Sequence, residues 1–433
     1  MMINQLTTDY NVNLKERTNS IIITFALILV AILIISYKFW ISYHIDSMFY
    51  EMLAQGKPVN KPFSERILYP IFASEILKVT KLSLNNSFFL ANLFGLSLLV
   101  IFVTILIKSI TSYAQVALPL LITPFLIRSF SLVYLPDLFS AGLTALFFYL
   151  VYRSYFWPGL LVLLLIYLTR ENAIILCLSL AAVGLYRYRL RWAIAGTVVL
   201  VAGILLTSLA GRHGLPQTYQ MNFMLYLLLK IPKNFLYNVC GLLIWTNVYP
   251  DVGNPYLLFT LPSWLPLGKL NTIGITPMQP LVPLNTLMIL LTTFGVAPSL
   301  LGLQLARHWK QILSENQLWL QTAIIYGLSS FVIGIMVSYD IQRLIGYAWP
   351  AFWLAVPALL LRYYTFNLSS LAQLLGYHVF VCWLPWIMRI PWFVDKVIMD
   401  SPMPFLVVIL SSIILHLLAI RTLSRSQEAL GSA

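Results

Sequence analysis

The chain has 433 residues, of which 60% are hydrophobic and only 9% are charged, and its mean hydropathy is +0.85. Soluble domains carry about 25% charged residues, so this composition excludes a soluble globular protein. The formal net charge of +13 is scattered along the chain, without the Lys/Arg-rich block that would indicate a nucleic-acid partner. Cys177, Cys240 and Cys382 lie in or beside apolar segments without metal-ligand or disulfide spacing, which indicates buried packing residues.

Continuous apolar runs of span length predict an all-α polytopic membrane protein with about twelve transmembrane helices, and we expect further juxtamembrane helices at its outer face. The first run, 21–40, begins after a polar segment and lacks a small-residue cleavage site, so we interpret it as a retained span. The later spans are expected at about 88–107, 115–135, 137–152, 157–169, 171–186, 193–210, 284–305, 317–338, 343–361, 368–388 and 402–420.

Two of these spans, 157–169 and 171–186, are short and meet at Arg170 and Glu171. One long tilted helix would also fit their combined length. It would place both charges near the middle of the membrane, at a cost of roughly 2.5–3.5 kcal/mol for each residue. We therefore predict two short helices that turn back at this pair.

Positive charge in the short turns places both termini on the cytoplasmic side. The basic residues expected there are Lys108, Arg153, the Arg187–Arg191 cluster, Arg307, Lys310, Arg362, Arg421 and Arg425. The acids expected on the outer side are Asp46, Glu51, Glu65, Glu75, Asp137, Glu171, Asp251, Asp340, Asp395 and Asp400. Because residues far apart in sequence converge on this outer face, we expect the functional site there.

The chain shows no internal repeat and no separate soluble domain, so we interpret residues 1–433 as a single transmembrane domain. Two polar stretches are long enough to shape a site on the outer side. They are the loops 41–87 and 211–283, both rich in prolines and aromatic residues. We expect these two loops to form the rim of the active site.

Two acids are candidate catalytic residues. Asp46 lies in HIDSMFYEMLA and shares a helix face with Phe49 and Tyr50. It could deprotonate a hydroxyl at the bilayer edge, or it could only cap a short interfacial helix. Asp137, after Pro136 at the start of a span, is either a helix cap or a second acid that lines the cleft.

Two adjacent pairs could bind substrate. Glu65 and Arg66 form either a surface ion pair or a phosphate contact, because a guanidinium donates two parallel hydrogen bonds to phosphate oxygens. Arg170 and Glu171 either pair with each other to fix the helical hairpin or orient the substrate. Both readings stay open for each pair.

Asp340 and Arg343 in SYDIQRLIGYAWP are either a helix-start pair or a site where Arg343 binds a lipid phosphate. Arg212 and His213 begin the second outer loop, and His213, like His44, is more typical of a structural histidine. No P-loop, GxGxxG, HExxH or nucleophile elbow occurs in the sequence. A mechanism driven by a cytosolic nucleotide is therefore unsupported, and we expect the donor to arrive by way of the membrane.

Three stretches carry a resemblance to a known family. They are HIDSMFYEMLA followed by SERILYP, PDLFSAGLTALFFYL with the later LTREN, and DIQRLIGYAWP. In these stretches and in its pattern of spans, the chain resembles the GT-C superfamily of polytopic glycosyltransferases, in particular its bacterial members. Many members also have a soluble C-terminal domain, which this sequence lacks.

The resemblance implies transfer of a sugar, with inversion, from a polyprenyl-phosphate carrier to a glycan or lipid acceptor at the outer face of the bacterial plasma membrane. Asp46 would be the general base or would position the acceptor, and Arg343, Arg170 and Arg66 would bind the carrier phosphate. Many members have paired acids in this loop, whereas Ser47 follows Asp46 here, so a divalent metal is not supported and no cofactor is predicted. Predicted partners are the donor, the acceptor and membrane lipids. The predicted site consists of Asp46 and Asp137 as catalytic residues, with Glu65, Arg66, Arg170, Glu171, Arg212, Asp340 and Arg343 binding substrate.

Two other functions remain open from the sequence. A glycolipid flippase or exporter would use the outer charges as a binding vestibule, but it would also need polar groups in the cytoplasmic half of the spans, which are scarce. An outward-facing polysaccharide polymerase or ligase would rely on arginines and a histidine of a large outer loop, for which Arg212 and His213 are candidates.

Overall fold

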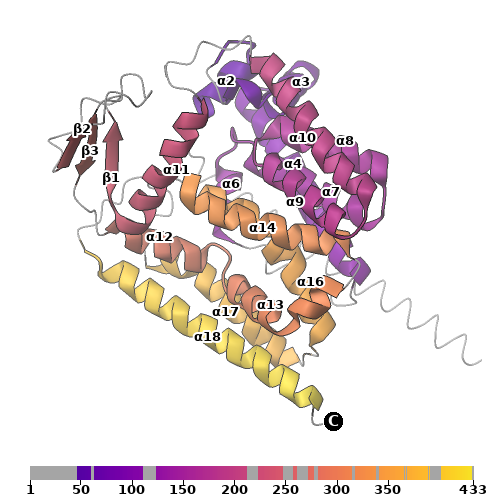
Figure 1. The fold of residues 1–433 in the computed structure, drawn as a ribbon, viewed down its shortest axis with the longest axis vertical. Coiled ribbons are helices and arrows are strands. Elements are labelled where there is room, and N and C mark those ends of the chain that lie inside the picture. The colour runs from indigo at the N-terminus through magenta and orange to yellow at the C-terminus, as the bar shows by residue number, and fades with distance from the viewer. Residues whose placement is uncertain are drawn as a thin grey trace, which may run out of the picture.

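The structure is a computed structural model of the whole chain, and its described part is predominantly helical, as the sequence predicts. In Figure 1, α14 crosses the middle of the molecule between α7–α10 on one side and α12, α13, α17 and α18 on the other. The residues described are 46–59, 63–110, 123–211, 223–246, 257–260, 272–276, 281–314, 317–337, 341–364, 366, 368–388, 390 and 401–431.

The first half of the described chain consists of helices. They are α2 (Ser47–Ala54), η1 (Phe63–Glu65), α3 (Leu68–Thr80), α4 (Leu84–Ile110), α6 (Pro124–Ser131), α7 (Asp137–Tyr152), α8 (Phe156–Thr169), α9 (Ala173–Tyr186), α10 (Leu190–Gly211) and α11 (Phe223–Cys240).

The second half begins with three short strands and returns to helices. The elements are β1 (Leu243–Thr246), β2 (Leu257–Thr260), β3 (Thr272–Thr276), α12 (Leu281–Thr292), α13 (Ala297–Ser314), α14 (Leu318–Val337), α15 (Ile341–Ile345), η3 (Gly346–Ala348), η4 (Pro350–Ala355), α16 (Val356–Tyr363), α17 (Leu368–Ile387) and α18 (Met403–Gly431).

Five helices in the described part are long and apolar enough to cross a membrane, and two bent helix pairs raise the number to seven. The helices α7, α8 and α9 are apolar but shorter. Helices cover all the expected spans from 137–152 to 193–210, and α8 and α9 are separate at Arg170 and Glu171, as predicted. The expected first span, 21–40, lies outside the described residues.

Three expected spans differ from the structure. The predicted span 343–361 is divided between α15–η3 and η4–α16, which are bent by 41°. The predicted span 284–305 is divided into α12 and α13, which are bent by 67°. Gly295 lies in this bend at φ +51°, and an added Cβ there would meet His378. Of the predicted span 115–135, the described part contains only the short buried helix α6. Apolar composition indicates which segments can enter the membrane but not where a helix breaks, so it misses these bends and the start of α6 at Pro124.

A small antiparallel sheet, which the sequence analysis did not predict, lies in the second outer loop. Its strand order is β1-β3-β2, with Leu243 opposite Thr276 and Leu257 opposite Ile275. Figure 1 shows the sheet at one flank of the molecule beside α11. The loop 41–87 contains short helices, as expected of juxtamembrane segments, because α2, η1 and α3 occupy most of its described residues.

The helices α4 and α7 run in the same direction and pack at backbone contact. Gly95 of α4 lies against the backbone of Phe139, and Gly142 of α7 lies against the backbone of Gly95. Near their far ends the Tyr152 hydroxyl donates to the Ser109 carbonyl at 3.4 Å. The packing therefore aligns the starts of both helices at one end of the bundle and their ends at the other.

Candidate active site

Asp46 and Arg343 meet although 297 positions separate them in the sequence. Asp46 directly precedes α2, but its side chain makes no capping hydrogen bond. The carboxylate instead accepts two hydrogen bonds of 3.2 Å on Oδ2, from Nη1 and Nη2 of Arg343 on α15. Its side chain is 18% exposed and that of Arg343 is 10% exposed. The contact therefore favours a role for Asp46 beyond helix capping.

Asp137 is the fully buried centre of the site. It is the first residue of α7, and it accepts hydrogen bonds on Oδ1 from Arg170 and from the Tyr347 hydroxyl. Its other oxygen, Oδ2, lies 3.7 Å from Nε of Arg343. The Arg170 guanidinium lies 4.9 Å from the centroid of the Tyr347 ring. Asp137 thus joins Arg170 of the α8–α9 turn to Arg343 of α15.

Arg66 and Glu171 form the second ion pair of the site. Arg66 donates from Nε to Glu171 Oε2 at 2.7 Å and from Nη2 to Oε1, which is the bidentate geometry of strong arginine–carboxylate pairs. Its Nη1 donates to the Tyr50 hydroxyl at 2.7 Å. Arg66 therefore pairs with Glu171 from another loop. The sequence suggests that Arg170 and Glu171 could pair with each other, but Arg170 binds Asp137 and Glu171 binds Arg66.

These contacts close into a ring. One group of contacts joins Asp46, Arg343, Asp137 and Arg170, and the other joins Glu171, Arg66 and Tyr50. The backbone connects the two groups at two places, because Tyr50 lies one helical turn after Asp46 and Arg170 is next to Glu171 in the chain. We call this set the polar ring: Asp46, Tyr50, Arg66, Asp137, Arg170, Glu171 and Arg343. Three carboxylates and three guanidinium groups balance within it. The segments that carry them come from α2, η1, α7, the α8–α9 turn and α15.

The Glu171 carboxylate titrates far below its ordinary range. Burial by itself raises its pKa, but the positive charges of Arg66 and Arg170 and the hydrogen bonds from Arg66 outweigh burial and lower the pKa to about 2. Because the side chain is still 52% exposed, solvent screens part of this attraction. Glu171 is therefore ionised throughout the physiological pH range.

The remaining predicted residues do not all join the ring. Glu65 is half-buried at the end of η1, next to Arg66. Arg212, His213, Asp340 and His44 lie outside the described residues.

Two positions beside the ring were not found by sequence analysis. Arg128 on α6 is buried, and its Nη1 donates to Gln342 Oε1 at 3.1 Å, directly next to Arg343. Tyr347, one turn after Arg343, bonds to Asp137. Arg128 had a recognisable signal, because an arginine inside an expected span is by default a functional candidate. Tyr347 had none, since nothing distinguishes it from the other tyrosines before the fold is known.

The site contains four buried guanidinium groups, those of Arg66, Arg128, Arg170 and Arg343. Glu65, next to Arg66, offsets the charge that Arg128 adds to the balanced ring. Among the described residues no three His, Cys, Asp or Glu side chains gather as metal ligands. Buried arginines next to a partly exposed carboxylate are suited to hold a phosphate group beside a base.

The sequence matches no family model and no curated protein. Among solved structures, the crystal structure of ArnT from Cupriavidus metallidurans in the apo state is similar in fold, with 11% sequence identity and a TM-score of 0.43. The similarity covers 95% of this chain and 78% of that chain. A likeness of this degree shows nothing about the reaction.

Proposed function

We propose that the protein is a membrane glycosyltransferase that moves a sugar from a polyprenyl-phosphate carrier to a hydroxyl acceptor. The observation that supports this best is the position of Asp46, a partly exposed carboxylate that shares Arg343 with the buried Asp137. In this arrangement the Asp46 carboxylate, as a base, is in contact with the Arg343 guanidinium, which can bind a phosphate. Transfer of a sugar from a phosphate needs both groups.

In the proposed reaction, Asp46 removes the proton from the acceptor hydroxyl, and the hydroxyl oxygen attacks the anomeric carbon of the sugar. The bond between the anomeric carbon and the phosphate oxygen breaks, and its electron pair leaves with the polyprenyl phosphate. A single displacement inverts the configuration at the anomeric carbon. Arg343, with Arg128 and Arg170 nearby, stabilises the negative charge that develops on the phosphate.

Arg343 connects donor binding to the base. In the structure both of its terminal nitrogens donate to Asp46. A donor phosphate competes for the same N–H groups, because a phosphate oxygen is at least as good an acceptor as a carboxylate. When Arg343 turns to the phosphate, the Asp46 carboxylate loses these hydrogen bonds and becomes a more effective base. Proton removal would then begin only after the donor is bound.

Asp137 has a positioning role in this proposal. Its side chain is fully buried, so an acceptor hydroxyl does not reach it. It holds Arg170 directly and Arg343 through the 3.7 Å ion pair. Although the sequence makes both acids catalytic candidates, the difference in burial favours Asp46 as the base and Asp137 as the residue that fixes the arginines.

The test is transfer of radiolabelled sugar from a polyprenyl-phosphate donor by the purified protein in lipid nanodiscs. Loss of a general base reduces rates by about 10²–10⁴-fold, so Asp46→Asn should reduce transfer by at least about 100-fold. Glu75→Gln is the matched control, because Glu75 is an exposed acid on α3 that pairs with Lys78 away from the ring. Full activity of a folded Asp46→Asn variant would disprove the assignment of the base.

A further inference from the structure

A cavity of about 360 Å³ lies at the end of the bundle opposite the polar ring, lined by Tyr152, Gln317, Leu361 and Arg362. Tyr152 is the last residue of α7 and Asp137 is the first, so the two places are roughly 22 Å apart at 1.5 Å of rise per residue. The volume is within the range of small-ligand sites, which begins near 300 Å³. The polar ring and the reaction proposed for it do not involve this cavity.

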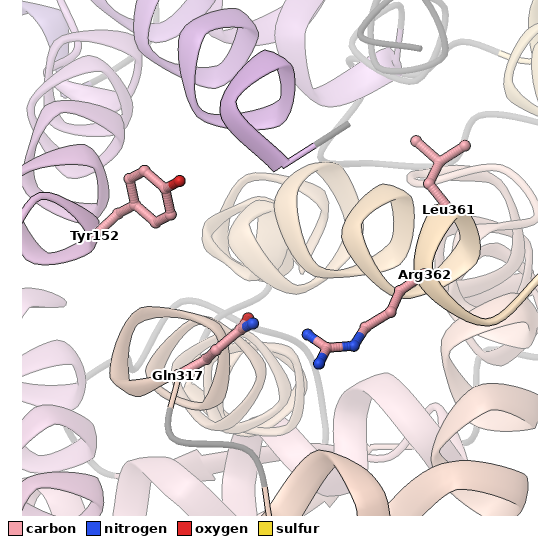
Figure 2. Close-up of a pocket in the computed structure, with 4 residues that line it drawn as sticks. All are labelled: Tyr152, Gln317, Leu361 and Arg362. Atoms are coloured by element: carbon pink, nitrogen blue, oxygen red, sulfur yellow. The ribbon is translucent and has the colours of Figure 1, made fainter. Parts of the chain in front are cut away.

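Three polar side chains turn towards the same space. Figure 2 shows the Arg362 guanidinium and the Gln317 amide approaching each other, with the Tyr152 hydroxyl pointing in from the facing helix. Tyr152 donates to the Ser109 carbonyl at 3.4 Å, which is long for a hydroxyl hydrogen bond. A better acceptor in the cavity can therefore attract this hydroxyl.

The described charged side chains around the cavity are positive, whereas Glu315, two positions before Gln317, lies outside the described residues. Gln317 directly precedes α14, so the positive end of that helix dipole faces this region. Arg153 directly follows α7. Arg187 directly follows α9, and it donates hydrogen bonds to Gln321 Oε1 on α14 and to the Leu313 carbonyl on α13. The carboxylates with described side chains belong to other segments: α2, η1, α3, the α8–α9 turn, the first residue of α7 and Asp46 before α2.

We propose that this cavity binds a phosphate group. Arg362 supplies the charge and two directed N–H groups, Gln317 and Tyr152 supply neutral donors, and the dipole of α14 adds a fixed positive potential. The phosphate belongs either to an anionic phospholipid headgroup, whose acyl chains continue along the apolar helices beside Leu361, or to a small soluble phosphate compound. Both sources present the same chemistry to the cavity.

The experiment measures binding to the purified full-length protein in two arms. One arm uses native mass spectrometry after exchange into phosphatidylglycerol, with phosphatidylcholine as the neutral lipid for comparison. The other arm follows thermal unfolding in neutral detergent while inorganic phosphate is added. Retention of phosphatidylglycerol alone would identify a headgroup, and a shift with inorganic phosphate would identify a soluble ligand. If neither arm shows binding, the proposal is wrong.

Arg362→Gln should weaken the binding at least about 10-fold, the size expected for one charged hydrogen-bond donor. Arg191→Gln removes the same charge from an exposed arginine in the first turn of α10, at the same end of the bundle, that does not line the cavity, so it should change the binding less than about twofold. Equal loss in both variants would show a diffuse effect of surface charge and would overturn the proposal. If Arg362→Gln does not fold, Gln317→Leu tests the same cavity while the charge of Arg362 is kept. Unaltered phosphate binding in the Gln317→Leu variant would count against the proposal.

Discussion

Two aspartates that look alike in the sequence have different environments in the structure. Asp46 and Asp137 each stand at the start of a helix, and each could be read as a helix cap. Neither makes a capping hydrogen bond, since both carboxylates bind arginines instead. Asp46 is 18% exposed, whereas Asp137 has no exposed surface. At the scale of single residues, burial therefore distinguishes a candidate base from a residue that holds charges in place.

The buried pair of Asp137 and Arg170 can be tested by a double-mutant cycle. Asp137→Leu or Arg170→Leu alone leaves a buried charge without its partner, so each should lower the free energy of unfolding by about 3–5 kcal/mol. The double variant removes both charges and should cost much less than the sum of the two single changes. Unfolding in detergent measures all four proteins. Additive losses would contradict a direct interaction between these two side chains.

The pair of Arg66 and Glu171 predicts a pH dependence. The pKa of Glu171 is lowered from 4.5 to about 2, so its stabilising effect is complete above pH 4.5 and disappears as the pH falls through 2. The difference in melting temperature between the wild type and Glu171→Gln should be constant from pH 8 to 5 and should shrink below pH 4.5. The effect is of the order of 1 kcal/mol or less, because the side chain is half exposed.

Glu75→Gln provides the comparison for this pH series, since its carboxylate is 56% exposed and pairs with Lys78 only three positions away. Exposed pairs of this kind contribute little, so this variant should match the wild type at every pH. A Glu171→Gln difference that stays constant down to pH 2 would show that the pair does not depend on the ionised carboxylate.

At the scale of helices, close packing of α4 on α7 sets the geometry of the site. This contact aligns Asp137 at the start of α7 with the start of α4, where Tyr69 donates to the carbonyls of Phe88 and Val133. The absence of side chains at Gly95 and Gly142 permits the two backbones to touch. The position of the Asp137 carboxylate therefore depends on the contact between Gly95 and Gly142, which lies about one helical turn further along α7.

Gly142→Ala tests this crossing. An added Cβ would lie 2.1 Å from the Gly95 carbonyl oxygen, and a backbone atom within a packed helix cannot move away at low cost. The variant should lose about 1–3 kcal/mol of stability, the usual cost of overpacking. In Gly302→Ala on α13 the new methyl meets nothing within 4 Å, so this control should be neutral or slightly stabilised. Thermal unfolding compares the two, and equal stability would argue against the close contact.

At the scale of the whole molecule, the described charges separate between the two ends of the bundle. Carboxylates and their arginines gather where α7 begins, and the cations of the turns after α7 and α9 lie where α7 and α9 end. The number of spans and the positions of the basic turns in the sequence predict the same division. They further predict that the polar ring faces the outer side of the membrane.

Thiol labelling in intact cells tests this orientation. Leu82→Cys places an exposed thiol in the turn before α4, and Tyr155→Cys places one in the turn after α7, both in a Cys240→Ser background because Cys240 is not fully buried. A membrane-impermeant maleimide should label Leu82→Cys in intact cells and Tyr155→Cys only after permeabilisation. Labelling of both from outside, or the reverse pattern, would refute the predicted topology.

The sequence by itself determined the class of this protein and much of its helical pattern. The apolar runs predict the helices from α7 to α10 closely, and the cost of charges in lipid predicts the break at Arg170 and Glu171. These are local properties, because membrane insertion is decided by the composition of each segment. The breaks at Gly295 and around α6 were missed because they depend on packing against other helices.

Only the tertiary structure decided which charges meet. Adjacency in sequence suggested pairs such as Glu65 with Arg66 and Arg170 with Glu171, whereas Arg66 bonds to Glu171 and Arg170 bonds to Asp137. The partners are separated by 105 and 33 positions, and no local rule connects them. Ion pairing in a low-dielectric interior depends on distances and burial, which exist only after the helices have packed.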